Sequence, residues 1–180
     1  VPAASENPRL RFWHWYSFAA ADYGKVQVKV DGATDWVDLS PEYTRTGSNT
    51  WTFPSLDLSD YAGQSVQLAF YFYSVQSGSF SNVSSGWYID DVEVVTGPYV
   101  FNNPETWENG IGDWASEFGT WEIGTPTNGP GSAYNGEQCA ATVLTGNYAE
   151  PVSSRLISPT YVVPAASENP RLRFWHWYSF

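Results

Sequence analysis

The sequence predicts an all-β protein, folded as a two-sheet β-sandwich of the jelly-roll type. Short segments alternate apolar with polar residues or are rich in β-branched and aromatic side chains, and clusters of Gly, Asn and Pro separate them. No segment shows sustained helical periodicity. Aromatic residues make up 18% of the 180 residues, and so many rings require a large core or partners that bury them.

Six segments are expected to be strands: 9–18, 25–30, 36–39, 50–53, 65–74 and 87–95. Turns are expected between them at 31–33, 46–49 and 77–79. Side chains alternate across a strand, so Leu10, Phe12, His14, Tyr16 and Phe18 share one face, and Val66, Leu68, Phe70 and Phe72 share another. These two faces are predicted to form the core. The Gly- and Pro-rich stretch 121–140 is expected to be an ordered loop anchored by Trp121 and Tyr134.

An exact repeat is the most informative feature of the chain. Residues 1–18 (VPAASENPRLRFWHWYSF) recur without change as residues 163–180, which gives a period of 162 residues. Such a match does not arise by chance, so the chain is interpreted as part of a tandem repeat or as an engineered duplication. Identical copies are typical of fibres, stalks and adhesins, and the tandem array is the favoured interpretation.

A boundary between repeat units is predicted at Gly97-Pro98, where the alternating segment 92–96 meets a strong turn signal. Residues 1–98 are then the C-terminal part of one unit, and residues 99–180 are the N-terminal part of the next. The joint contains no Ser- and Gly-rich spacer of the kind that makes a flexible tether. Neighbouring units are therefore expected to pack against each other.

Charge excludes two classes of partner. With 8 Lys+Arg against 19 Asp+Glu, the chain carries a net charge of −11 and repels nucleic acid and anionic lipid. No apolar stretch approaches the roughly 20 residues of a membrane span, so no membrane insertion is expected. Without the repeated residues Glu168, Arg171 and Arg173, one period holds 18 acidic and 6 basic residues (19 − 1 and 8 − 2). Each copy therefore carries a net charge of about −12, and neighbouring copies repel unless bound cations or close packing offset the charge.

The sequence carries no recognisable catalytic motif, and the protein is not expected to be an enzyme. His14 and its duplicate His176 are the two histidines, and no Ser/His/Asp order or His-Glu-x-x-His motif is present. His14 is expected to be a core residue. The lone Cys139 excludes an intrachain disulfide between these residues.

Several motifs carry a family resemblance. They are Trp107-Glu108-Asn109-Gly110, the segment 56–64 (LDLSDYAGQ) and the segment 86–92 (GWYIDDV). Together they resemble the MAM-like jelly-roll superfamily of secreted bacterial proteins, which includes cleaved-adhesin modules and domains appended to immune-inhibitor-type metalloproteases. The disulfide pattern of animal MAM domains is missing, so the bacterial branch is the better match. The resemblance implies a β-sandwich that binds or spaces, located outside the cell or at its surface.

The same resemblance implies a structural Ca²⁺ site. Its ligands would be Glu108 of the opening motif and Asp91 of the closing Asp-Asp motif, with Asp90 beside it. Carboxylates are the hard oxygen ligands that Ca²⁺ prefers. Asp91 and Glu108 belong to consecutive units under the predicted boundary, so the neighbouring copy would complete the site. The alternative is that Asp90 and Asp91 are solvated or cap a turn.

An aromatic surface is the second candidate site. Trp13, Trp15, Tyr71 and Tyr73 lie opposite the predicted core faces and are expected to form a platform for sugar rings or for a neighbouring protomer. The alternative is a second core layer beneath loops. The leading hypothesis is a non-enzymatic extracellular repeat module that binds copies of itself in a fibre, stalk or sheath. The second is a Ca²⁺-dependent carbohydrate-binding or adhesive module of a secreted hydrolase.

Overall fold

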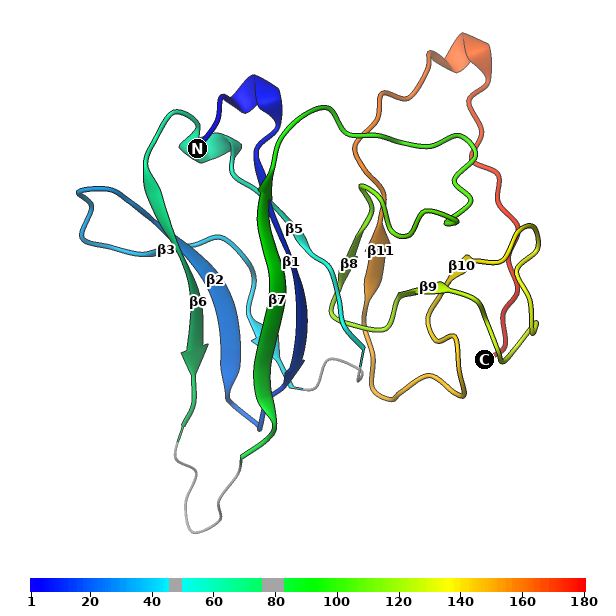
Figure 1. The fold of residues 1–180 in the computed structure, drawn as a ribbon, viewed down its shortest axis with the longest axis horizontal. Helices are drawn as coiled ribbons and strands as arrows, with labels where there is room; N and C mark the ends of the chain where they lie inside the picture. The colour runs from blue at the N-terminus through cyan, green and yellow to red at the C-terminus, as the bar shows by residue number, and fades with distance from the viewer. Residues whose placement is uncertain (46–49, 76–82) are drawn as a thin grey trace.

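The all-β prediction is confirmed. The computed structural model describes residues 1–45, 50–75 and 83–180, and their regular structure consists of antiparallel strands and three short 3₁₀ turns (Figure 1). Four strands are long: β1 (Arg9–Ser17), β2 (Tyr23–Val30), β6 (Val66–Tyr73) and β7 (Gly86–Val95). The short strands are β3 (Val37–Asp38), β4 (Tyr43–Thr44), β5 (Ser55–Asp57), β8 (Ala115–Glu117), β9 (Glu122–Gly124), β10 (Cys139–Ala141) and β11 (Arg155–Ile157). The 3₁₀ turns are η1 (Ala4–Glu6), η2 (Ser59–Tyr61) and η3 (Ala166–Glu168).

Two larger antiparallel sheets contain the long strands, an arrangement compatible with a β-sandwich. One sheet has the order β5-β1-β7, and in the other β2 pairs with β3, β4 and β6. The β2–β6 ladder runs without a break from Tyr23↔Tyr73 to Val30↔Val66. Two small ladders, β8–β11 and β9–β10, lie on the far side of β1 and β5 from β2 and β6 (Figure 1).

β1 supplies the centre of the hydrophobic core. Leu10, Phe12 and His14 are completely buried, and Tyr16 and Phe18 are 3% and 5% exposed, so the face predicted from alternation is confirmed. Phe12 packs edge-on against Phe70 of β6, with ring centroids 5.0 Å apart. Each fully buried side chain of this size contributes about 1.5–3 kcal/mol to folding, which makes β1 the strand with the largest share of the core.

The predicted strand at 50–53 is wrong. Only an isolated bridge forms there, between His14 and Thr52. The backbone N–H of Phe53 donates to Ser116 Oγ at 2.9 Å, and Phe53 O accepts from the N–H of Ser116, so this residue pairs with a distant segment. The edge of β1 is instead paired by β5, which was not predicted.

Other expectations were met in part. In β6, Leu68 and Phe70 pack against the core, but Phe72 is 50% exposed and stacks on Phe18 near the strand end. The stretch 121–140 contains β9 and the start of β10. Tyr134 is exposed and stacks on Trp175. The turn at 31–33 is present, while those predicted at 46–49 and 77–79 lie outside the described residues.

Candidate functional site

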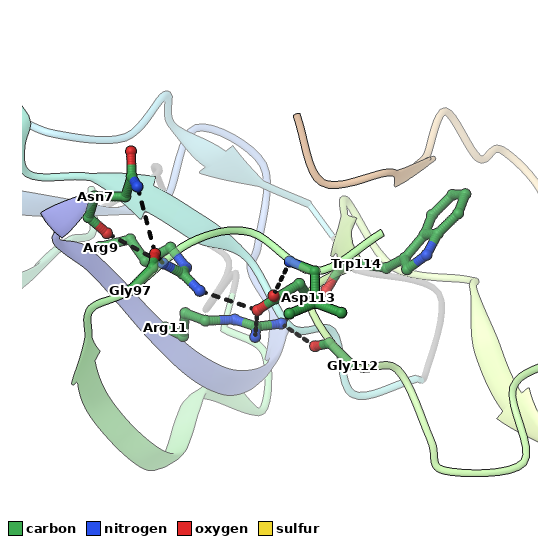
Figure 2. Close-up of polar contacts among 8 residues, drawn as sticks. Asn7, Arg9, Arg11, Gly97, Gly112, Asp113 and Trp114 are labelled. Atoms are coloured by element: carbon green, nitrogen blue, oxygen red, sulfur yellow. Dashed lines mark hydrogen bonds and ion pairs between the residues drawn. The ribbon is translucent and has the colours of Figure 1, made fainter. Parts of the chain in front are cut away.

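Two buried arginines tie β1 to the segment that follows the predicted unit boundary. Arg9 and Arg11 lie on the outer face of β1, 2% and 5% exposed. An Arg9 Nη atom is 3.0 Å from Asp113 Oδ1, and an Arg11 Nη atom is 3.5 Å from the same oxygen (Figure 2). Arg11 also donates to the carbonyls of Gly112, at 2.9 Å, and Trp114, at 2.7 Å. We call Arg9, Arg11 and Asp113 the arginine clasp.

Most polar atoms of the clasp have partners, whereas Arg11 Nε is buried and has none among the described residues. Asp113 Oδ2 accepts a bond from the N–H of Val100, so both of its oxygens are used. Arg9 also donates to the carbonyls of Asn7 and Gly97, at 3.1 and 3.2 Å. Burial, the dominant cause, lowers the pKa of Arg11 from its ordinary value, and neighbouring Arg9 adds to this while Asp113 opposes it. A buried charge is tolerable only when it is paired in this way, so losing one partner is costly.

Sequence reasoning missed the clasp. Alternation placed Arg11 on the outer face of its strand, but nothing in the local pattern pointed to Asp113, about a hundred residues away. The available signal was compositional: two of only 8 basic residues occur at alternate positions of the repeated strand, and therefore on one face.

The predicted aromatic platform is not assembled as one surface. Trp13 stacks on Phe53 at 4.7 Å and Trp15 meets Tyr88 edge-on at 5.5 Å, both on the outer face of the β5-β1-β7 sheet. Tyr71 and Tyr73 belong to β6 and are 39% and 40% exposed. They lie on the outer face of the other sheet, so the four residues form two separate aromatic surfaces. Outer faces of two packed sheets point away from each other, which is the physical reason for the separation.

A shallow depression lies beside Trp13 at an irregularity in β7. It is lined by Trp13, Phe53, Asp91, Val92 and Glu93. The register passes from Arg11↔Glu93 to Trp13↔Asp90, so two steps along β1 oppose three along β7. Asp91 takes a positive φ of 47° at this β-bulge. Bulges redirect side chains in this way and are common next to binding sites.

The three predicted calcium ligands do not form one cluster. Glu108 Oε1 accepts the backbone N–H groups of Glu137 and Gln138, each at 3.0 Å. Asp90 Oδ1 accepts the N–H of Asp91 at 2.9 Å. Within the described residues, no group of three or more His, Cys, Asp or Glu side chains is arranged to hold a metal ion. A site completed by a neighbouring copy stays a prediction.

His14 lies in the core, as expected. Its Nδ1 accepts a hydrogen bond from Trp87 Nε1 at 3.2 Å, which leaves the proton of the neutral ring on Nε2. Burial lowers the pKa of His14 to about 3, so the ring is neutral at physiological pH. Nε2 is buried and has no hydrogen-bond partner in the described part of the chain. The ring packs against Phe12, Tyr16 and Tyr43, which is the environment of a core residue.

The second copy of the repeat has a different environment. Every residue from 164 to 180 is exposed, including Leu172 at 74%, Phe174 at 69% and Trp175 at 73%. No strand pairing of 171–180 occurs with any described residue. Trp175 stacks on Tyr134, with centroids 4.0 Å apart, and Trp177 lies close to Gly129. Residues 1–18 and 163–180 therefore share a sequence but not an environment.

Comparisons with known proteins add one partial match. Over 84 residues, 46% of this chain, the sequence is 38% identical to Bacillopeptidase F of Bacillus subtilis (strain 168), and the match spans only about 5% of that protein's length. No family model matches the chain. No solved structure matches it either. Among the described residues, no helix is long and apolar enough to cross a membrane.

Proposed function

We propose that this chain is a non-enzymatic extracellular repeat module that assembles into a fibre, stalk or sheath through stacked or strand-exchanged β-sandwiches. One observation carries the proposal: an 18-residue segment recurs exactly at a period of 162 residues, and its first copy includes the central, buried strand of a sheet. A unit that recurs with its core strand unchanged is typical of a tandem array of like modules.

The arginine clasp supports packing between successive parts of the chain. It binds residues 112–114 directly to β1, although these residues follow the predicted boundary at Gly97-Pro98. A flexible tether would leave the following segment free of such buried contacts. Stacked modules that each carry a net charge near −12 repel one another, so positively charged side chains are needed where the modules touch. The clasp contains two of the few basic residues.

The extracellular location is supported by the partial match to a bacterial peptidase and by the family resemblance of the sequence. The non-enzymatic assignment rests on the sequence, which offers no nucleophile with a paired base. The buried, neutral His14 supports it further, because that ring has no access to a substrate.

Electron microscopy of the native protein, with and without a chelator, tests the proposal. Regular filaments whose repeat matches one module are expected, and discrete monomers at all concentrations would contradict it. Loss of the filaments in EDTA, with recovery in Ca²⁺ but not in Mg²⁺, would support a calcium site that uses Asp90, Asp91 and Glu108. Filaments that are indifferent to EDTA would remove calcium from the proposal and leave the assembly in place.

The alternative is a Ca²⁺-dependent carbohydrate-binding or adhesive module of a secreted hydrolase. The stacked pair Trp13 and Phe53 favours it, because this pair borders a depression that also contains Asp91 and Glu93. Aromatic faces beside carboxylates are suited to stacking and hydrogen-bonding a sugar ring. A glycan array tests it, with Trp13→Ala and Trp15→Ala as variants and Tyr73→Ala on the opposite face as the control. Binding that is absent, or equal in all variants, would exclude this function.

A further inference from the structure

We propose that a hollow between β9 and the loop of residues 142–149 binds one neutral sugar ring. The loop directly follows β10, which pairs with β9, so both walls belong to one small ladder (Figure 1). The hollow has a volume of about 260 Å³, slightly below the range of about 300–1,000 Å³ typical of pockets for drug-sized ligands, and it therefore suits a single ring. The lining residues with polar groups include Thr50, Glu122, Thr142, Thr145, Asn147 and Tyr148.

Glu122 contributes a carboxylate to the hollow. Its Oε2 accepts the backbone N–H of Leu144 at 2.7 Å, and its Oε1 accepts the hydroxyl of Thr50 at 3.3 Å. Each oxygen of an ionised carboxylate has two lone pairs, so each keeps one acceptor position for a ligand. Two adjacent hydroxyls of a sugar ring can donate to these two oxygens, and hydrogen bonds to a charged acceptor are roughly twice as strong as bonds between neutral groups.

The opposite wall is held in place by the protein itself. The N–H of Leu144 bonds to the carboxylate, and the carbonyl of the same residue accepts the N–H of Thr127 at 2.9 Å. The side-chain amide of Asn128 donates to the carbonyl of Gly146. These bonds tie the loop to β9 and to the turn that follows it. A loop that is already fixed loses little conformational freedom on binding, which favours affinity.

Three polar side chains of the loop are available to a ligand. Those of Thr142, Thr145 and Asn147 form no hydrogen bond with any residue in the described ranges. Together they offer two hydroxyls, an amide carbonyl and an amide NH₂, which match the donors and acceptors of sugar hydroxyls. The hydroxyl of Thr120, by contrast, lies 2.5 Å from Ser154 Oγ and is already committed within the protein.

Tyr148 adds an aromatic surface to the same hollow. This residue is 45% exposed, so its ring is accessible to a ligand. An aromatic ring packs against the C–H face of a pyranose while the hydroxyls at the edge of the sugar reach polar groups nearby. Val143 and Ala149 extend the apolar part of the lining. An apolar surface with a few placed polar groups is the general character of small-molecule sites.

Charge restricts the ligand to neutral sugars. Lysine and arginine are absent from the described residues that line the hollow, whereas the carboxylate of Glu122 is present. The chain as a whole carries a net charge of −11. Uronic acids, sulfated sugars and sugar phosphates are therefore repelled at the hollow and on approach to it.

Titration of the full-length protein with D-glucose, D-galactose and D-mannose tests the proposal, with binding followed by NMR of the backbone amides. EDTA is present throughout, and D-glucuronate is the charged counterpart. Asn147→Ala and Thr145→Val each remove a polar group at an exposed position, so they are expected to fold normally. Thr125→Val, which is exposed and lies outside the lining, is the matched control. Glu122→Gln keeps the size of the side chain and removes its charge.

At least one of the three neutral sugars is expected to bind with a Kd on the order of 1 mM, as suits one ring in a partly open hollow. Asn147→Ala and Thr145→Val should each weaken this binding by about fivefold, the effect of losing one hydrogen bond. Glu122→Gln should weaken it by about tenfold, because its bonds involve a charge. Thr125→Val should bind like wild type. The proposal is overturned if none of the three sugars binds, if Asn147→Ala binds like wild type, or if D-glucuronate binds more tightly than D-glucose.

The same titration distinguishes this hollow from the depression beside Trp13. Binding at the hollow should persist in Trp13→Ala, and loss in Trp13→Ala with retention in Asn147→Ala would place the sugar at the depression instead. Sugar binding at the hollow does not require self-assembly, so electron microscopy of the same samples separates the two. Filaments without sugar binding would overturn the sugar site and leave the proposed function standing, whereas sugar binding without filaments would do the reverse.

Discussion

Residues 1–18 and 163–180 have one sequence and two structures. Both copies form the same 3₁₀ turn, followed by an asparagine in the left-handed region. Only the first copy continues into a strand, because only there do β5 and β7 supply hydrogen-bond partners. The turn is thus encoded locally, whereas the strand depends on its neighbours in space.

Deleting the same ring from each copy gives the largest expected difference. Phe12→Ala leaves a cavity in the core and should lower the free energy of unfolding by about 3–5 kcal/mol. Phe174→Ala removes an exposed ring and should leave the unfolding midpoint unchanged in dilute solution. Urea denaturation followed by tryptophan fluorescence measures both. Equal losses in the two variants would mean that the second copy is also packed.

The arginine clasp gives the next difference. Arg11→Ala removes a buried cation from Asp113 and from two carbonyls, and it should destabilise the fold by about 3 kcal/mol. Arg173→Ala, its copy, should show no measurable change. The comparison is made by thermal unfolding at fixed ionic strength. If Arg11→Ala behaves like Arg173→Ala, the clasp does not hold the two parts of the chain together.

The pH dependence of stability is expected to differ between variants of His14 and variants of its copy His176. His14 has a pKa lowered to about 3, so between that value and about 6.5 the unfolded chain binds a proton that the folded chain does not. Stability from this group is complete above about pH 6.5 and falls as the pH drops, by about 2 kcal/mol at pH 5. His14→Phe should flatten the profile in this window relative to wild type, and His176→Phe should retain it. Urea midpoints from pH 4.5 to 7.5 provide the test.

The alternation of apolar and polar residues was sufficient to predict the core where one face of a strand is buried. In 9–18 the alternation identified every core residue, because the side-chain period of a strand is fixed by its geometry. It failed at 50–53, because the backbone of Phe53 bonds to Ser116, 63 residues away. The clasp and the separation of Trp13 from Tyr71 also depend on how distant segments are placed.

The ends of β1 and β7 have a consequence for a chain under tension. Arg9 pairs with Val95, so the polypeptide enters this sheet and leaves it at neighbouring points. The bonds that close this base are the N–H of Gly97 to Glu6 O and Arg9 to both Gly97 O and Asp113. A pulling force applied to the two flanking segments passes through these few contacts and bypasses the rest of the sandwich. In the proposed array of modules, the clasp is therefore expected to determine how much load a module bears before it opens.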